Sequence, residues 1–469
     1  MSTAIVWFRR DLRLADNPAF AAAMKEHDAV VALYIHAPDE EAPWRPGSAS
    51  HWWLHHSLAA LDADLRKRGA RLQIEQGASL DTLQRLLKST RADAVYWNRL
   101  YEPAVIERDA RIKQHLRDAG VDARSFNAAL LFEPWEIATG SDGPYRVFTP
   151  FWRKARARLE VRPPLSAPRR IPMPEVSAGY SLDELALLPT IRWDSEFHQV
   201  WHPGEAGAAK ALRTFCKGPI ADYAAARDMP AQEGTSRLSP HLHFGEISPM
   251  QVAWALQELA TNAQDTAGAE PYLREIGWRE FSHHLLFHFP QTPQKNLNPR
   301  FDHFPWAADD EVALRRWQRG RTGIPIVDAG MRELWETGYM HNRVRMLVAS
   351  FLTKHLRQHW LHGARWFWDT LVDADLANNT QGWQWTAGSG ADAAPYFRIF
   401  NPVTQGERFD KNGDYVRRWI PNLREFSAKD IHQPWRNPDA LRRSGYPAPI
   451  VDLASSRAQA LAAYREVSG

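Results

Sequence analysis

The sequence predicts an α/β N-terminal domain with a Rossmann-like parallel sheet, then a long linker and an all-α C-terminal domain. Three observations support this fold class. Strand-like and helix-like segments alternate up to residue 131, prolines recur between residues 132 and 203, and helical patterns dominate from residue 204 onward. A chain of 469 residues can hold two or three domains, at about 150 residues each. We therefore expect a first domain at 1–131, a linker at 132–203 and a second domain at 204–469.

Five short β-prone runs lie in the first domain, at residues 4–8, 30–35, 71–75, 94–97 and 123–126. Longer helical patterns separate them, at residues 51–69, 80–90 and 107–120. This alternation predicts a parallel sheet covered on both faces. The first run is followed by Arg9-Arg-Asp-Leu-Arg-Leu14 instead of Gly-x-Gly-x-x-Gly, so the dinucleotide-binding fingerprint is absent.

The linker is rich in proline and is locally basic. Residues 153–170 carry seven Lys and Arg residues against one acid, Glu160. A solvated, partly irregular linker explains this composition more often than a strip that faces phosphates does, and both interpretations stay open.

Composition narrows the class of protein. Net charge is only +3 and the isoelectric point is about 8.9, so overall basicity alone does not indicate nucleic-acid binding. Cys216 is the one cysteine, which excludes an intrachain disulfide and a cysteine-ligated iron–sulfur cluster. The N-terminus turns charged at Arg9, too soon for a signal peptide, and no apolar run predicts a membrane span. We expect a cytoplasmic protein without a metal site, because no His, Cys or Asp spacing suits one.

Residues 360–385 hold the most informative pattern of the C-terminal domain. Asp373 and Asp375 stand two residues apart beside an Asn pair and several tryptophans. Core packing alone would not select Asp-x-Asp, because Asp is rarely buried without a partner. The combination favours a pocket for a polar, aromatic cofactor that is connected to oxidisable rings, although packing is the more common role of any single Trp.

Three further patterns suit polar ligands. Residues 234–240 offer hydroxyl and backbone donors beside Arg237, which suits a pyrophosphate, although caps and turns use the same residues. Glu275 and Trp278 share a helix face, where they could bind and stack on a base or simply face the core. The His341–Arg345 stretch carries Asn and two Arg residues that suit phosphates or an exposed basic turn.

Seven motifs in a fixed order then resemble one known family over nearly the whole chain. They are Val6–Asn17, Glu233–Ser239, Trp278–Phe281, Thr322–Asp328, Met340–Arg343, Asp373–Trp385 and Asp392–Pro402. The chain resembles the DNA photolyase and cryptochrome family, most closely the bacterial class I photolyases that act on cyclobutane pyrimidine dimers.

The resemblance implies a U-shaped FAD in the C-terminal domain. By motif match, the residues expected to hold its phosphates and ribose are Tyr223, Thr235, Ser236, Arg237, Leu238 and Ser239. Asp373, Ala374 and Asp375 are expected at the isoalloxazine edge, where Arg345 should pair with a carboxylate, and Asn379 is expected at flavin N5. A neutral amide can both donate and accept a hydrogen bond, so it tolerates a reduced, anionic flavin.

The resemblance also implies residues for DNA and for electron transfer. Glu275 should hydrogen-bond the flipped-out pyrimidine edge, Trp278 and Trp385 should wall its pocket, and Met346 should lie beneath it. Further expected contacts to the lesion and its phosphates are Arg227, Asn342, Arg343 and Gln405. Trp383, Trp360 and Trp306 match the photoreduction chain of the family, in that order from the flavin to the surface.

The implied activity is a light-driven carbon–carbon lyase reaction. Excited FADH⁻ would transfer an electron to the flipped-out dimer in DNA and thereby split its cyclobutane ring. The chain has Ala104-Val105 where folate-binding members carry Asn-Glu, so a deazaflavin, a differently bound folate, a flavin or no antenna chromophore all stay open. We expect a monomer. The rival hypotheses are a cryptochrome-like photoreceptor and a light-independent FAD or nucleic-acid-binding protein.

Overall fold

The structure is a computed structural model that describes residues 2–262, 267–393 and 397–468. The chain forms two compact units. Unit 1 comprises Met1–Arg192, Trp201–Ala221 and Ser236–Pro290. Unit 2 comprises Trp193–Val200, Asp222–Thr235 and Gln291–Gly469. The domain limits proposed at residues 131 and 203 stay predictions.

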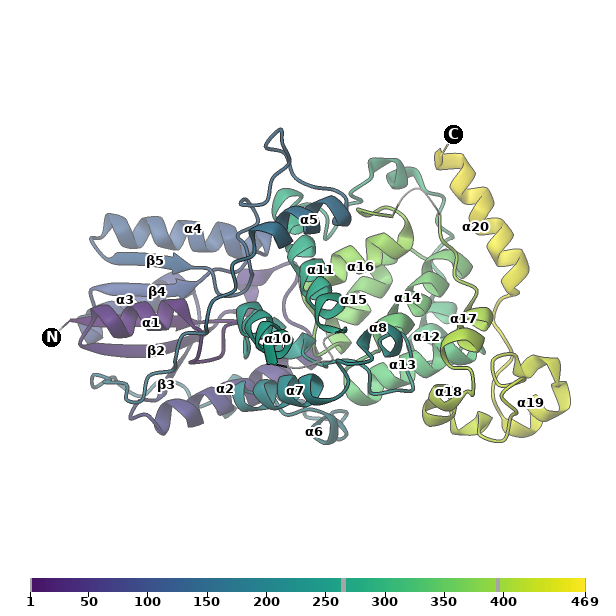
Figure 1. Cartoon of the computed structure of the whole chain (residues 1–469), viewed down its shortest axis with the longest axis horizontal. Helices are drawn as coiled ribbons and strands as arrows, with labels where there is room; N and C mark the ends of the chain where they lie inside the picture. Colours follow the sequence, from purple (N-terminus) through teal and green to yellow (C-terminus); the bar gives the residue numbers. More distant parts are fainter. Residues whose placement is uncertain (1, 263–266, 394–396, 469) are drawn as a thin grey trace. The chain divides into compact units, whose positions relative to one another are not determined.

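A five-stranded parallel sheet forms the centre of the N-terminal part of unit 1 (Figure 1). Its strand order is β3-β2-β1-β4-β5, with Ala4 opposite Val30 on one side and Ala94 on the other. The strands are β1 (Thr3–Phe8), β2 (Ala29–His36), β3 (Leu72–Gln76), β4 (Ala94–Asn98) and β5 (Asp122–Phe126). All five predicted strands are present within two residues of their predicted limits, and the predicted fold class is confirmed.

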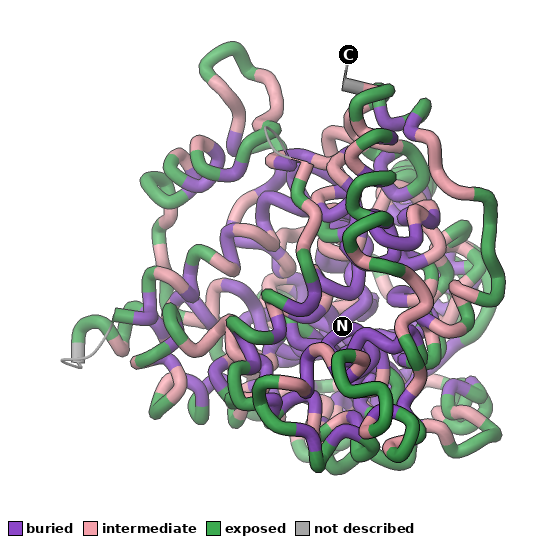
Figure 2. The backbone as a smooth tube through the Cα atoms, turned by 90° about the vertical axis from the view of Figure 1, so that its right-hand side faces the viewer, coloured by how far each residue is buried: buried purple, intermediate pink, exposed green. Residues whose placement is uncertain are grey.

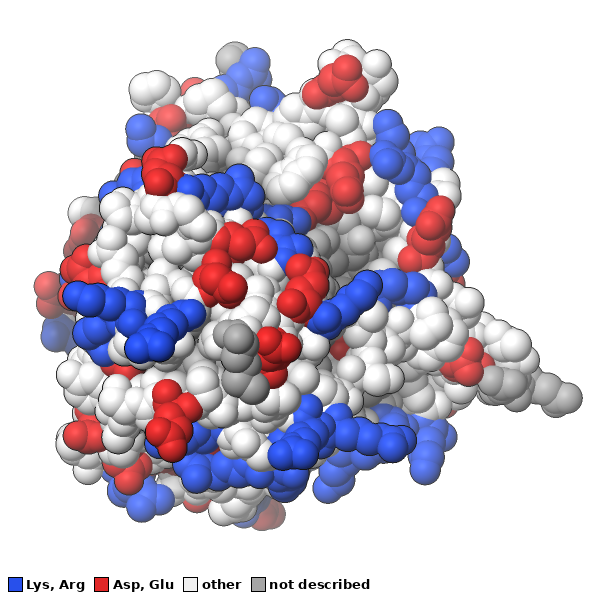
Figure 3. Space-filling view, turned by 90° about the vertical axis from the view of Figure 1, so that its left-hand side faces the viewer, with Lys and Arg blue, Asp and Glu red and all other residues white. Residues whose placement is uncertain are grey.

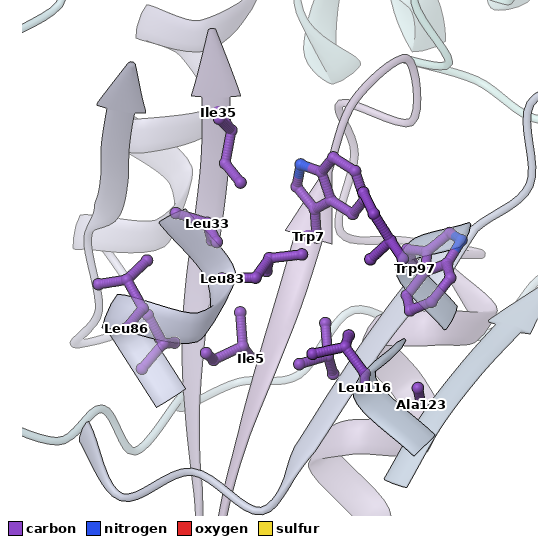
Figure 4. Close-up of a cluster of buried hydrophobic side chains, with 12 residues drawn as sticks. Ile5, Trp7, Leu33, Ile35, Leu83, Leu86, Trp97, Leu116 and Ala123 are labelled. Carbon is purple, nitrogen blue, oxygen red and sulfur yellow. The ribbon is translucent and has the colours of Figure 1, made fainter. Parts of the chain in front are cut away.

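Helices that link the strands cover the sheet, as in other parallel α/β folds. They are α1 (Pro18–Glu26), α2 (Ser48–Arg66), α3 (Ser79–Thr90) and α4 (Pro103–Asp118). Asn17 caps α1 by accepting a hydrogen bond from the Phe20 amide, and Pro18 occupies the first turn, where its missing N–H is harmless. Figure 4 shows Ile5, Leu33 and Leu83 pointing into one core on the sheet face.

Charged side chains crowd the carboxyl end of β1, where sheets of this kind often bind nucleotides. Arg9 and Arg108 both lie over the Trp7 ring, at 4.6 and 5.0 Å from its centroid. Asp109 accepts hydrogen bonds from both guanidinium groups, at 2.8 Å from Arg9 and 2.8 to 3.0 Å from Arg108. In dinucleotide-binding proteins, a glycine-rich loop follows the first strand. Here the cluster of Arg9, Arg108 and Asp109 occupies that end of the strand.

The proline-rich segment, for which we favoured a solvated and partly irregular linker, contains regular structure. It contains α5 (Phe148–Arg158), a short 3₁₀ turn at Asp183–Leu185, and an extended stretch that bonds to the edge of the sheet, where Tyr180 donates to the Ile74 carbonyl. Several of its basic residues form ion pairs within the protein. Arg162 pairs with Asp16, and Arg156 pairs with Glu270. The sequence did not reveal α5, because its apolar residues are interleaved with arginines.

Four further helices complete unit 1. They are α7 (Glu205–Lys217), α9 (Ser239–His243), α10 (Pro249–Asn262) and α11 (Ala269–His288). Arg13 stabilises this unit from the interior, because its fully buried guanidinium donates to the carbonyls of Asp16, Ala128 and Gly245. Figure 3 shows acidic and basic side chains intermixed over the face that it displays, in keeping with the small net charge of +3.

The described residues of unit 2 form helices joined by turns and irregular segments, and they include no β-strand. Its helices are α6 (Phe197–Val200), α8 (Tyr223–Ala226), α12 (Glu311–Gln318), α13 (Pro325–Thr337), α14 (Asn342–Ser350), α15 (Trp360–Thr370), α16 (Leu376–Ala387), α17 (Pro402–Phe409), α18 (Asp414–Trp419), α19 (Pro438–Ser444) and α20 (Leu453–Ser468). Short 3₁₀ turns lie at Pro299–His303, Pro421–Leu423 and Pro434–Arg436, as another does in unit 1 at Pro38–Glu41. Figure 2 shows how buried stretches alternate with exposed ones along these helices.

One predicted helix differs from the structure. The helical pattern of residues 343–358 in the sequence predicts a single helix. In the structure, α14 ends at Ser350 and a π-helical turn follows at Phe351–His355. This turn buries Lys354, whose ammonium group donates to the Ala387 carbonyl at 2.5 Å. π-turns often occur at functional sites. No helix in residues 2–262, 267–393 and 397–468 is long and apolar enough to cross a membrane.

Candidate functional site

The two acidic residues of the Asp-x-Asp pattern have different partners in unit 2. Asp373 is buried and receives two hydrogen bonds from one Arg345 nitrogen, at 2.8 and 3.0 Å. A further Arg345 nitrogen donates to the Met340 carbonyl at 2.7 Å. Burial lowers the pKa of Arg345, but Asp373, Tyr339 and Glu333 together outweigh this effect, so the net shift is upward. The pair therefore keeps a fixed cation and a fixed anion beside each other.

Asp375 is the N-cap of α16. Its carboxylate accepts hydrogen bonds from the Asn378 backbone amide at 2.8 Å and from the Asn378 side chain at 2.7 Å. Ala374, between the two acids, is buried and offers only backbone groups. The two hydrogen bonds offset at least part of the free-energy cost of burying the Asp375 carboxylate, because N-caps of this type stabilise helices by about 1 kcal/mol.

Asn379 lies on the first turn of the same helix. Its amide nitrogen donates to the Ala364 carbonyl of α15 at 2.9 Å, which fixes the orientation of the amide. The side chain is half-buried. Within unit 2, α16 thus presents an oriented amide shortly after the cap made by Asp375.

The hydroxyl-rich loop begins in unit 2 and ends in unit 1. In unit 1, Tyr272 donates to the Ser236 hydroxyl at 2.8 Å, and the Leu238 amide donates to the same oxygen at 3.3 Å. Arg237 adopts a left-handed backbone with φ of 52°. Ser239 is exposed and is the first residue of α9. The Ser236 hydroxyl is therefore positioned by its neighbours.

Two other predicted cofactor residues lie in unit 2. Tyr223 is buried on α8, and the guanidinium of Arg227 lies 5.4 Å from its ring centroid. Thr235 is half-buried. Gly234 runs so close to α8 that a Cβ there would lie 2.7 Å from the Ala226 carbonyl oxygen, so the loop needs glycine at this point.

These residues suit the chemistry of FAD. The isoalloxazine edge alternates acceptors and an N–H donor, and unit 2 offers an arginine, a carboxylate and an amide in Arg345, Asp373 and Asn379. Hydroxyl groups and an arginine, as in Ser236, Ser239 and Arg237 of unit 1, suit phosphates. The donor set therefore fits the cofactor that the resemblance implies. Which atom each residue would contact stays a prediction.

The predicted lesion contacts of unit 1 lie on α11. Glu275 and Trp278 are both half-buried and stand three residues apart, on neighbouring positions of one helix face. The Trp278 ring stacks on Phe148 of α5, with ring centroids 3.7 Å apart and an interplanar angle of 9°. The structure thus places a carboxylate and a supported indole together.

Arg343, a predicted phosphate contact of unit 2, has three neighbouring side chains. This residue forms an ion pair with Asp228 at 2.8 Å and lies 4.4 Å from the Phe409 ring centroid. Its other guanidinium nitrogen approaches the Met346 sulfur at 3.8 Å. Gln405 is four residues before Phe409 on α17, hence on the same helix face. Sequence reasoning did not find Asp228, because only folding brings it to Arg343.

Asn342 and Trp385 complete the predicted DNA-binding set of unit 2. Asn342 is exposed at the first turn of α14, whose N-cap is His341. Trp385 is half-buried on α16, with the guanidinium of Arg398 5.1 Å from its ring centroid. A cation in this position is attracted by the quadrupole of the indole ring.

The three tryptophans of the predicted electron path all lie in unit 2 and differ in burial. Trp383 and Trp360 are 2% and 1% exposed, whereas Trp306 is half-buried. The His359 ring lies between Trp306 and Trp360, with centroid distances of 5.1 and 5.7 Å. Trp383 packs on Gly363, one turn along α15 from Trp360, where any Cβ would clash. The predicted order from the flavin outward is compatible with these exposures.

Comparison with known proteins identifies the family. The model for the FAD-binding domain of DNA photolyase matches residues 272–466, and the DNA photolyase model matches residues 4–172. The deoxyribodipyrimidine photo-lyase of Agrobacterium fabrum is 49% identical over 99% of this chain and 98% of its own length. The chain belongs to the DNA photolyase and cryptochrome family. Its domain composition therefore includes the FAD-binding domain of the family.

The expected class I assignment needs correction. A solved structure of a class III photolyase from Agrobacterium tumefaciens is 49% identical and covers 100% of this chain and 98% of its own, with a TM-score of 0.95. Cryptochrome-1 of Arabidopsis thaliana is 41% identical over 97% of this chain and 69% of its own length. Residues 394–396 of the Asp392–Pro402 motif lie outside the described residues.

Proposed function

We propose that this photolyase-family chain repairs cyclobutane pyrimidine dimers in DNA in a light-driven reaction, as a deoxyribodipyrimidine photo-lyase. The observation that carries this proposal is the arrangement on unit 2 of the Arg345–Asp373 pair with the oriented amide of Asn379. The full-length identity to a protein named deoxyribodipyrimidine photo-lyase supports it. Bound, reduced FAD would supply a light-excited electron donor, which no side chain of the chain can replace.

The chain's own residues would bind and orient the flavin and the pyrimidine dimer, and they would exclude water from both. Arg345 and Asp373 would fix the flavin edge, and Asn379 would donate or accept a hydrogen bond at N5. Glu275 would hold the edge of the pyrimidine dimer, while Trp278 and Trp385 would stack on it. Met346 would contact the dimer through its sulfur-containing side chain. Arg343, Arg227, Asn342 and Gln405 would contact phosphates or the lesion without reading sequence.

The electron path is a separate part of the proposal. Trp383, Trp360 and Trp306 would carry an electron inward to restore the reduced cofactor after oxidation. This path serves activation, so repair by protein that is already reduced would not need it. We expect the chain to act as a monomer.

A cryptochrome-like photoreceptor is the second candidate, because the identity to Arabidopsis Cryptochrome-1 is 41%. The two candidates differ in one property, since a photoreceptor would change state in light without altering a DNA lesion. Asn379 favours repair, because an Asp is expected at this position in plant-type cryptochromes.

One experiment separates these candidates. Purified, chemically reduced protein is mixed with an oligonucleotide that carries one thymine cyclobutane dimer, and a matched oligonucleotide carries a (6-4) product. Restoration of intact thymines from the first substrate under blue light, with none in the dark, supports the proposal. Repair of only the (6-4) substrate would change the lesion class. Flavin that responds to light without repair of either substrate would favour the photoreceptor.

A further inference from the structure

Helix α5 of the proline-rich segment holds an aromatic residue directly against Trp278. Phe148, the first residue of α5, is fully buried, and α5 packs on α11 within unit 1. Its ring is nearly parallel to the Trp278 ring, at a centroid distance of 3.7 Å and an angle of 9°. This is closer than the centroid distance of about 4.5 to 7 Å that is usual for aromatic pairs. One face of the Trp278 indole is therefore covered over a large part of its area.

Neighbouring side chains hold Phe148 in this position. The Trp152 ring, one turn along α5, is parallel to Phe148 within 7° at 6.4 Å. Phe281 of α11 meets both Phe148 and Trp278 edge-on, at 5.8 and 6.0 Å. Phe148 thus has ring contacts besides Trp278 that help to hold its plane.

The spacing of the two helices is fixed beside this stack. Gly277 faces Trp152 so closely that a Cβ there would lie 2.4 Å from the Trp152 Cε3 atom. A larger residue would push α5 away from α11, because two rigid ring systems cannot move aside cheaply. The close approach keeps Phe148 and Trp278 in register.

Trp278 itself is only half-buried. Since Phe148 covers one face, stacking on a base is directed to the opposite face of the indole. A side chain that is immobilised before binding also spares the conformational entropy that binding would otherwise cost. The contact with Phe148 therefore determines which face of the Trp278 indole can stack on a base, and it limits the motion of that indole.

We infer that Phe148 is a positioning residue for lesion binding, which holds Trp278 in the orientation that stacks on the flipped-out pyrimidine dimer. This inference rests on the proposed function. It assigns to the proline-rich segment, which sequence reasoning treated as a linker, a part in the recognition of damaged DNA. Phe148 acts through Trp278 and not through a contact of its own with the lesion.

The test measures dark binding of a thymine-dimer oligonucleotide and of its undamaged twin, for Phe148→Leu in parent and Trp278→Ala backgrounds. Phe148→Leu is expected to weaken lesion binding about three- to tenfold, the range that corresponds to ordering one side chain. Undamaged DNA should bind as before, and repair per bound lesion under light should be unchanged. In the Trp278→Ala background, the Phe148→Leu effect should fall to nearly nothing, because the two residues act as one unit. Phe148→Tyr should restore parental affinity.

Parental affinity in Phe148→Leu would overturn the inference, as would a loss of equal size in the Trp278→Ala background. If thermal unfolding or flavin content shows that Phe148→Leu is misfolded, Phe148→Met replaces it, because methionine keeps the volume without a flat ring. The proposed function is tested separately by the parent protein. If the parent repairs dimers, an unchanged variant contradicts only the role of Phe148. If the parent neither prefers nor repairs the lesion, the proposed function itself fails.

Discussion

One guanidinium nitrogen of Arg345 donates to both carboxylate oxygens of Asp373, at 3.0 and 2.8 Å. The Asp373 side chain is 4% exposed, so it has almost no water to replace this partner. Breaking a buried pair of this kind from one side leaves an uncompensated charge, which costs more than the pair itself contributes.

Arg345→Ala should therefore lower both stability and cofactor retention. We expect a loss of about 3 kcal/mol in the free energy of unfolding, the lower end of the range for a broken buried pair, because Arg345 is partly exposed. Urea unfolding and the flavin absorbance of purified protein measure the two effects. Adding Asp373→Asn to this variant should recover part of the stability but not the flavin. A fully flavin-loaded Arg345→Ala protein would contradict the role of the pair.

Trp383→Phe should separate activation from repair. Removing the indole that we place nearest the flavin should slow photoreduction of oxidised flavin at least tenfold, while protein that is reduced beforehand should repair as the parent does. Absorbance of oxidised flavin under blue light follows the first step. Trp97→Phe is the matched control, because Trp97 is equally buried but lies in the sheet core of unit 1. Normal photoreduction by Trp383→Phe would show that the path is assigned incorrectly.

Arg343→Ala should weaken DNA binding by removing one phosphate contact. The slope of log affinity against log salt should become shallower by about one, with little dependence on sequence. Asp228→Asn should strengthen binding modestly, because the ion pair at 2.8 Å competes with phosphate for Arg343. Arg442→Ala, an exposed arginine on α19, serves as the control. A salt slope that is the same in Arg343→Ala as in the parent would remove Arg343 from the DNA contacts.

Glu280 should make stability depend on pH. Complete burial raises the pKa of its carboxyl from 4.5 to about 7, although Arg279 and the backbone amides of Leu131 and Phe132 oppose this shift. The folded state thus holds a proton that the unfolded state releases, and the associated stability is present below pH 4.5 and lost as pH rises through 7. Glu280→Gln mimics the protonated acid and should not lose this stability. The free energy of unfolding of the variant, relative to that of the parent, should therefore increase by about 3 kcal/mol between pH 4.5 and 8, because each unit of pKa shift corresponds to about 1.4 kcal/mol. Thermal or urea unfolding at both pH values checks this, and a constant difference would contradict it.

Much of the fold could be predicted because its signals are local. Each strand of the sheet is a short run of β-prone residues between helical patterns, so β1 to β5 were found within two residues. The π-helical turn at Phe351–His355 was not found; it buries Lys354, whose partner, the Ala387 carbonyl, lies far along the chain and leaves no local signal. Helix α5 was missed because prolines and arginines surround its few apolar residues.

The types of residue in the site could be predicted from the sequence, but their hydrogen-bond and ion-pair partners could not. The unusual Asp-x-Asp pattern singled out Asp373 and Asp375 in the sequence, yet only the structure shows that one pairs with Arg345 while the other caps α16. Asp228 and Phe148 gave no local signal, because each matters through a partner more than a hundred positions away. The expected class I assignment rested on motifs alone, whereas the solved structure that is 49% identical is that of a class III photolyase.

The most direct measurement is a single-turnover repair experiment. Reduced protein in excess over a thymine-dimer oligonucleotide is exposed to brief pulses of blue light, and intact thymine strands are counted after each pulse against a dark sample. The account predicts that repaired strands accumulate with the number of pulses and that none appear in the dark. Bound lesion that survives every pulse, in protein whose flavin is present and reduced, would contradict the claim that this chain is a photolyase.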